Sequence, residues 1–221
     1  MQLSDLAQRI LGALIEKAMA TPQAYPLSVN ALRAACNQTT GRDPITEYDT
    51  DHMADGLREL SGQSLVRAAY ARRSSTPKYE HMLGPHLEID DPSVAILGVL
   101  LLRGPQTVGE LRQRTERLHH FAELGEVQSV LDALSIHPFG ALVEELPRQP
   151  GRKETRWRHL LGGEQPGDPV VAQPAVAGAA EAVDVDARAE VVQLGVTLAE
   201  LQAEVSALRD ELDRIRRFVG A

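Results

Sequence analysis

Two clusters of basic side chains carry the clearest chemistry in this 221-residue sequence. The first comprises Arg67, Arg72, Arg73 and Lys78, and the second comprises Arg148, Arg152, Lys153, Arg156 and Arg158. Guanidinium and ammonium groups bind phosphate and carboxylate oxygens, so each cluster could contact a nucleic-acid backbone or an acidic protein surface. Exposed turns are also often basic for solubility alone. The sequence leaves both interpretations open.

No other set of residues matches a known catalytic or metal-binding pattern. The sequence has no Gly-x-x-x-x-Gly-Lys, Gly-x-Gly-x-x-Gly or Gly-x-Ser-x-Gly motif. His119 and His120 follow the basic residues Arg112, Arg114 and Arg117, but adjacent histidines lack the spacing of zinc ligands. We therefore expect no enzyme activity, no metal and no cofactor.

The basic clusters need elements that position them, and the first 88 residues predict three helices and a hairpin. Apolar residues at helical spacing predict a first helix from Leu3 to Ala18, capped by Ser4. Ser28 opens a second helix, and a third runs from about Thr50 to Ser61. Residues 64–70 and 78–83 predict two strands around the first basic cluster.

The same order of elements returns in residues 89–164. Val94 to Leu101 predicts a helix that Gly104 ends, Thr107 caps the next, and Glu123 to Ile136 predicts a third. Strands follow at 141–146 and 155–160, around the second basic cluster. The pattern predicts a mainly α protein with small β-hairpins (α+β), built as two tandem winged-helix domains, residues 1–88 and 89–164.

The charge distribution argues against ordinary insertion of the third helices into a DNA groove. The net charge of −8 divides into −1 for residues 1–88, −2 for 89–164 and −5 for 165–221. The third helix of the first domain and its lead-in carry Glu47, Asp49, Asp51, Asp55 and Glu59 against Arg58, and the third helix of the second domain carries Glu123, Glu126 and Asp132. Phosphates repel these carboxylates, so we expect any contact with DNA to be made by the basic hairpins, the wings.

The last 57 residues predict a linker and a dimerising helix. Residues 165–187 are rich in Pro, Gly, Ala and Val, which is typical of a linker. Residues 188–221 carry a heptad repeat of apolar residues: Val191, Leu194, Leu198, Leu201, Val205, Leu208, Leu212 and Ile215. This repeat, with Glu204 placed to face Arg209 of a second copy, favours a parallel two-stranded coiled coil and a homodimer. A single amphipathic helix packed on the chain's own domains is the alternative.

Several segments resemble the signature blocks of the YceH-like family of uncharacterised bacterial proteins. They are residues 25–32 (YPLSVNAL), 35–38 (ACNQ), 78–81 (KYEH), 101–107 (LLRGPQT), 109–112 (GELR) and 146–148 (LPR). The resemblance covers residues 6–164 and implies two tandem winged-helix domains, with no established activity or catalytic residues. Residues 39–42 (TTGR) are less basic than the family pattern leads us to expect, so no nucleic-acid contact is carried over to them.

These observations favour a dimeric protein that binds double-stranded DNA weakly, through its backbone, as a DNA-binding or transcription-associated accessory factor. The alternative is a protein-interaction scaffold that does not bind nucleic acid.

The single Cys36, on an apolar helix face, can form no intramolecular disulfide, so we expect a buried thiol and a cytoplasmic location. The longest apolar stretch, Ala95 to Leu102, is far shorter than the roughly 20 residues of a membrane span.

Overall fold

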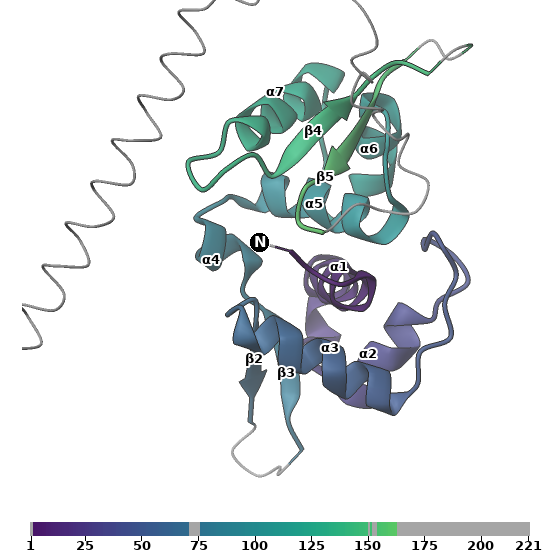
Figure 1. Cartoon of the computed structure of the whole chain (residues 1–221), viewed down its shortest axis with the longest axis vertical. Coiled ribbons are helices and arrows are strands. Elements are labelled where there is room, and N and C mark those ends of the chain that lie inside the picture. Colours follow the sequence, from purple (N-terminus) through teal and green to yellow (C-terminus); the bar gives the residue numbers. More distant parts are fainter. Residues whose placement is uncertain (1, 71–75, 150, 152–153, 163–221) are drawn as a thin grey trace, which may run out of the picture. The chain divides into compact units, whose positions relative to one another are not determined.

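The computed structural model describes residues 2–70, 76–149, 151 and 154–162, which form a mixed α+β structure with small antiparallel sheets (Figure 1). The first half contains α1 (Asp5–Ala20), the 3₁₀ helix η1 (Pro22–Ala24), β1 (Leu27–Ser28), α2 (Val29–Cys36), α3 (Thr50–Gly62), β2 (Val66–Ala69) and β3 (Lys78–His81). The second half contains α4 (Leu83–Leu87), α5 (Asp91–Arg103), α6 (Val108–Thr115), α7 (Leu124–Ser135), β4 (Val143–Leu146) and β5 (Arg156–His159). The predicted linker and coiled coil lie outside the described residues.

Side-chain caps set the starts of several helices, as the sequence predicted. Ser4 accepts a hydrogen bond from the backbone N–H of Ala7, and Ser28 accepts one from Ala31. Thr107 forms a capping box with Glu110 at the start of α6. Each cap satisfies a backbone donor that has no partner within its helix. The positions predicted from Ser4, Ser28 and Thr107 are therefore confirmed.

The two halves share a strand arrangement around their hairpins. In the first half the sheet order is β1-β3-β2, and Leu27 of β1 pairs with Tyr79 of β3. In the second half β4 pairs with β5 alone, but Gln106 makes an isolated bridge to Trp157 of β5. Leu27 and Gln106 each immediately precede the residue that caps the following helix. The pairing thus occurs at the same place in both halves.

The first and fifth helices join the two halves into one compact unit (Figure 1). Every residue of α5 from Ser93 to Leu102 is buried. Glycines allow α1 and α5 to approach closely: a Cβ on Gly98 would lie 2.6 Å from Cγ2 of Ile15, and one on Gly12 would lie 2.8 Å from Cγ of Leu102. One hydrophobic core therefore includes side chains from both halves.

The segment after β3 differs from the sequence prediction. We expected a strand to continue to Leu83, but β3 ends at His81 and Leu83 begins the short helix α4. The side chain of Leu83 is fully buried, so the apolar character that suggested a strand reflects packing against the core. Gly84 and Pro85 follow in α4, and proline is tolerated in the first turn of a helix, where no partner for its missing N–H is needed.

Candidate nucleic-acid interface

In the first hairpin, one basic residue forms an ion pair with an acidic residue on the neighbouring strand. Arg67 of β2 lies opposite Glu80 of β3, and its Nε donates to Oε1 of Glu80 at 2.8 Å. The Arg67 side chain is 63% exposed, so it can still reach a ligand from the surface. Lys78 is exposed at the start of β3. Arg72 and Arg73 lie outside the described residues.

In the second hairpin, two basic residues form ion pairs with glutamates of the protein itself. Arg156 donates to the carbonyl of Pro105 at 2.6 Å and to Oε1 of Glu110 at 3.0 Å, and only 24% of its side chain is exposed. Arg158 pairs with Glu144 on the adjacent strand. Arg156 thus ties β5 to the capping box of α6, so a phosphate contact would require it to leave two partners.

Among the described cations of this hairpin, Arg148 is the one that is free to contact a ligand. It follows β4, is exposed, and within the described part of the chain its side chain has no hydrogen bond or ion pair. Arg152 and Lys153 lie outside the described residues. The accessible predicted contacts with known positions are therefore Arg67, Lys78 and Arg148.

The acidic residues of α3 and its N-cap are mostly exposed, and several have structural roles. Asp49 accepts a hydrogen bond from the backbone N–H of His52, which together with the His52 side chain lowers the pKa of Asp49. Asp55 pairs with Arg58, and Glu59 accepts hydrogen bonds from Ser4. Asp51 is exposed without such a partner among the described residues. The face of α3 therefore repels phosphate.

The exposed side of α7 is also acidic. Glu126 accepts a hydrogen bond from the backbone N–H of Ala122, and Asp132 accepts one from Gln128. Glu123 precedes the helix and is exposed. No Lys or Arg lies within α7. Neither third helix is rich in the side chains that read base edges in a major groove: Arg58 of α3 is paired with Asp55, and Gln128 of α7 is hydrogen-bonded to Asp132.

A buried arginine that no sequence pattern indicated holds the segment between α2 and α3. The Arg42 side chain is 0% exposed and donates to Glu16 at 2.7 Å and to the carbonyl of Ala35 at 2.8 Å. Asn37 and Tyr48 close the same segment with two mutual hydrogen bonds. Polar residues in a loop give no periodic signal, so nothing in the sequence indicated that Arg42 is buried.

Comparison with known proteins identifies the family. Residues 3–152 match the family described as "Protein of unknown function, DUF480". The chain therefore belongs to this family of uncharacterised bacterial proteins.

The relatives are similar over most of their length. A UPF0502 protein of Dechloromonas aromatica is 43% identical over 208 residues, 94% of this chain and 93% of its own. A UPF0502 protein of Geotalea uraniireducens is 43% identical over 219 residues, 99% of this chain and 95% of its own. UPF0502 protein GSU0233 of Geobacter sulfurreducens is 47% identical over 164 residues, 73% of each chain.

Among the described residues, no helix is both long and apolar enough to cross a bilayer. The same residues contain no group of three or more His, Cys, Asp or Glu side chains placed to hold a metal ion.

Cys36 is buried, as predicted, and burial raises the pKa of its thiol to about 12. The thiol is thus kept protonated and unreactive.

Proposed function

We propose that this protein is a dimeric, tandem winged-helix accessory factor that binds DNA or acts with the transcription machinery. The observation that carries the proposal is the repeated arrangement of three helices and a hairpin. In both halves the residue before the N-cap of the second helix pairs with the last strand. That pairing joins Leu27 to Tyr79 in one half and Gln106 to Trp157 in the other. A three-helix unit with a β-ribbon is a common DNA-binding design.

The proposed contact is with the phosphate backbone, through the two wings. Lys78, Arg148 and Arg67 are exposed in the structure, and Arg72, Arg73, Arg152 and Lys153 complete the two basic clusters. The acidic faces of α3 and α7 make groove insertion unfavourable. Arg156 is engaged with Glu110, so its part in binding is secondary.

Dimerisation through the C-terminal heptads would bring four wings into one assembly. Linked weak sites bind more tightly than separate ones when they can engage together. The heptad residues from Val191 to Ile215 support a parallel pair. Removing residues 188–221 should leave a monomer, which light scattering of the two purified proteins would measure; an unchanged molar mass per particle would contradict the dimer.

The decisive experiment titrates the full chain against random duplex DNA at several salt concentrations. Backbone binding predicts affinity that falls steeply with salt, and the double variants R72Q/R73Q and R152Q/K153Q should each weaken it and reduce the slope by about two. The charge-matched control R33Q/R58Q removes two exposed cations from α2 and α3 and should bind like the parent. No binding at low salt would refute the proposal.

A protein-interaction scaffold is the second candidate, because the exposed acids of α3 and α7 and the internal pairs of Arg156 and Arg158 all lower affinity for DNA. In that case a basic protein partner would bind α3, and charge reversal at Asp51 and Asp55 would abolish the complex.

We further propose that the protein is not an enzyme and that it is cytoplasmic. We also propose that the YceH-like resemblance and the DUF480 family describe the same proteins.

A further inference from the structure

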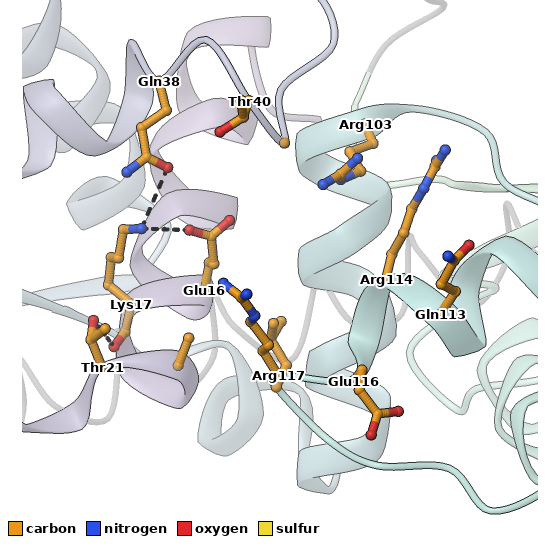
Figure 2. Close-up of a pocket in the computed structure, with 13 residues that line it drawn as sticks. Glu16, Lys17, Thr21, Gln38, Thr40, Arg103, Gln113, Arg114, Glu116 and Arg117 are labelled. Atoms are coloured by element: carbon orange, nitrogen blue, oxygen red, sulfur yellow. Dashed lines mark hydrogen bonds and ion pairs between the residues drawn. The ribbon is translucent and has the colours of Figure 1, made fainter.

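A cleft of about 850 Å³, lined mainly by polar and charged residues, lies away from the hairpins and between the two halves (Figure 2). One wall comes from the end of α1 and the segment after α2, including Lys17, Gln38 and Thr40. The opposite wall comes from the end of α5 and from α6 with the turn that follows it: Arg103, Gln113, Arg114, Glu116, Arg117 and Leu118. The volume falls in the range of small-molecule sites, about 300–1,000 Å³.

Three arginines of this cleft lack strong internal partners. Among the described residues, the side chains of Arg103 and Arg117 make no hydrogen bond or ion pair. Arg114 lies 3.7 Å from Oε1 of Glu110, an oxygen that Arg156 already binds at 3.0 Å. Arg103 and Arg114 are half-buried, and such arginines are normally paired, whereas Arg117 is exposed. All three guanidinium groups leave donors available in a shared hollow.

The positive charge of the cleft is not cancelled by its own carboxylates. Glu16 is bound by Arg42 at 2.7 Å and by Lys17 at 2.6 Å. Glu116 pairs with His120 on the surface, and Figure 2 shows its carboxylate directed away from the other cleft residues. Burial and the charge of Arg114 lower the pKa of Arg103, while Glu16 opposes that shift. The cations in the cleft thus repel one another, and an anion would relieve that repulsion.

The ends of helices explain only part of this arrangement. Lys17, Arg103 and Arg114 lie in the last turns of α1, α5 and α6, where the partial negative charge of a helix end favours cations by about 0.3–1 kcal/mol. That effect requires each cation to lie near its own helix end. It does not account for Arg117, which follows α6 and extends into the same cleft (Figure 2).

We propose that this cleft binds a small molecule carrying two or more linked phosphate groups, held by Arg103, Arg114 and Arg117 on one wall and Lys17 on the other. Planar guanidinium groups donate two parallel hydrogen bonds to phosphate oxygens, and Gln38, Thr40 and Gln113 supply further polar contacts. A duplex is normally met by projecting elements such as hairpins or helices. A recess with cations on two facing walls suits a ligand that enters it.

Calorimetric titration of the full chain with inorganic pyrophosphate, at about 0.15 M salt, tests the site. We expect one binding event per chain and a loss of affinity of at least tenfold in R103Q/R117Q, since each charge-assisted hydrogen bond contributes about tenfold. The charge-matched control R33Q/R58Q, with both cations exposed and outside the cleft, should stay within about twofold of the parent. Equal binding by the parent and R103Q/R117Q, or no binding, would overturn the proposal.

A second variant and a second ligand complete the test. Q113E places a carboxylate at the exposed rim of the cleft without removing any internal contact, so it should weaken pyrophosphate binding even if R103Q/R117Q fails to fold. The wing variants R72Q/R73Q and R152Q/K153Q should bind pyrophosphate like the parent, which separates this site from the proposed DNA contact. If random duplex DNA displaces pyrophosphate and loses affinity in R103Q/R117Q, the cleft binds a nucleic-acid backbone and the small-molecule assignment is wrong.

Discussion

The two halves follow one plan but stabilise the connection between their second and third helices differently. In the first half, residues 37–49 are held by the buried Arg42, which binds the carboxylate of Glu16 and backbone carbonyls. In the second half, residues 116–123 are shorter and are held by the buried Phe121 and by Arg112, which donates only to the carbonyls of Phe121 and Ala122. A longer polar segment thus depends on a buried ion pair, and a shorter one depends on an aromatic side chain.

The largest effect is expected where the first half depends on that ion pair. Arg42→Ala leaves Glu16 with only Lys17 and removes hydrogen bonds to backbone carbonyls, so it should lower the free energy of unfolding by about 3 kcal/mol. Arg112→Ala, in the second half, should cost about 1 kcal/mol. Urea denaturation of the full chain measures both. Equal losses would show that the two connections are held equally strongly.

The contact between the halves provides the next comparison. Gly98→Ala forces a methyl group to within 2.6 Å of Ile15, so it should destabilise the protein by about 2 kcal/mol through overpacking. Gly125→Ala in α7 is the matched control, because nothing lies within 4 Å of the added Cβ. Its effect should be neutral or stabilising by less than about 1 kcal/mol. Thermal unfolding of both variants would decide whether the glycine or the close approach matters.

A smaller difference is expected between the bases of the two hairpins. Arg156→Ala removes contacts to Pro105 and Glu110 from a largely buried side chain and should cost about 1.5 kcal/mol. Arg67→Ala removes one exposed cross-strand pair and should cost about 0.5 kcal/mol or less. Chemical denaturation distinguishes the two. If Arg156→Ala proves neutral while it weakens DNA binding, Arg156 is a contact residue and not a structural one.

The smallest effect concerns pH and the first hairpin. Burial lowers the pKa of His81 below its ordinary value of 6.5, so the ring is neutral in the folded protein where the unfolded chain would already bind a proton. The free energy of unfolding should therefore be highest above pH 6.5 and decline as the pH falls below that value. His81→Gln should show a shallower decline between about pH 7.5 and 5.5, and an identical slope would argue that His81 titrates normally.

The sequence predicted the regular elements well because their signals are local. Ser4, Ser28 and Thr107 each indicated a helix start that the structure confirms, and the short segments on either side of each basic turn predicted both hairpins. The short helix α4 was missed, since Met82 and Leu83 directly follow the strand residues and fit a longer strand equally well. The bridge between Gln106 and Trp157 was missed because it joins residues 51 positions apart without any pattern of its own.

The candidate sites were harder to predict, because they depend on which charges meet after folding. The basic clusters were visible as residue types, but the pairing of Arg156 with Glu110, 46 residues away, was not. The cleft brings Lys17 together with Arg103 and Arg117, and no spacing relates these residues. Charge in the sequence indicates where binding could occur, whereas the partners that neutralise it depend on tertiary contacts.

The close packing of α1 against α5 also determines what either half could do alone. Leu11 and Ile15 of α1 are fully buried, and the backbone N–H of Leu3 donates to the carbonyl of Leu161 near the end of the second half. Separated at residue 88, each fragment would carry an uncovered apolar helix face, so aggregation is expected instead of independent folding. Although the pattern repeats, the copies are no longer interchangeable modules: a harmful substitution in one would unfold its neighbour as well.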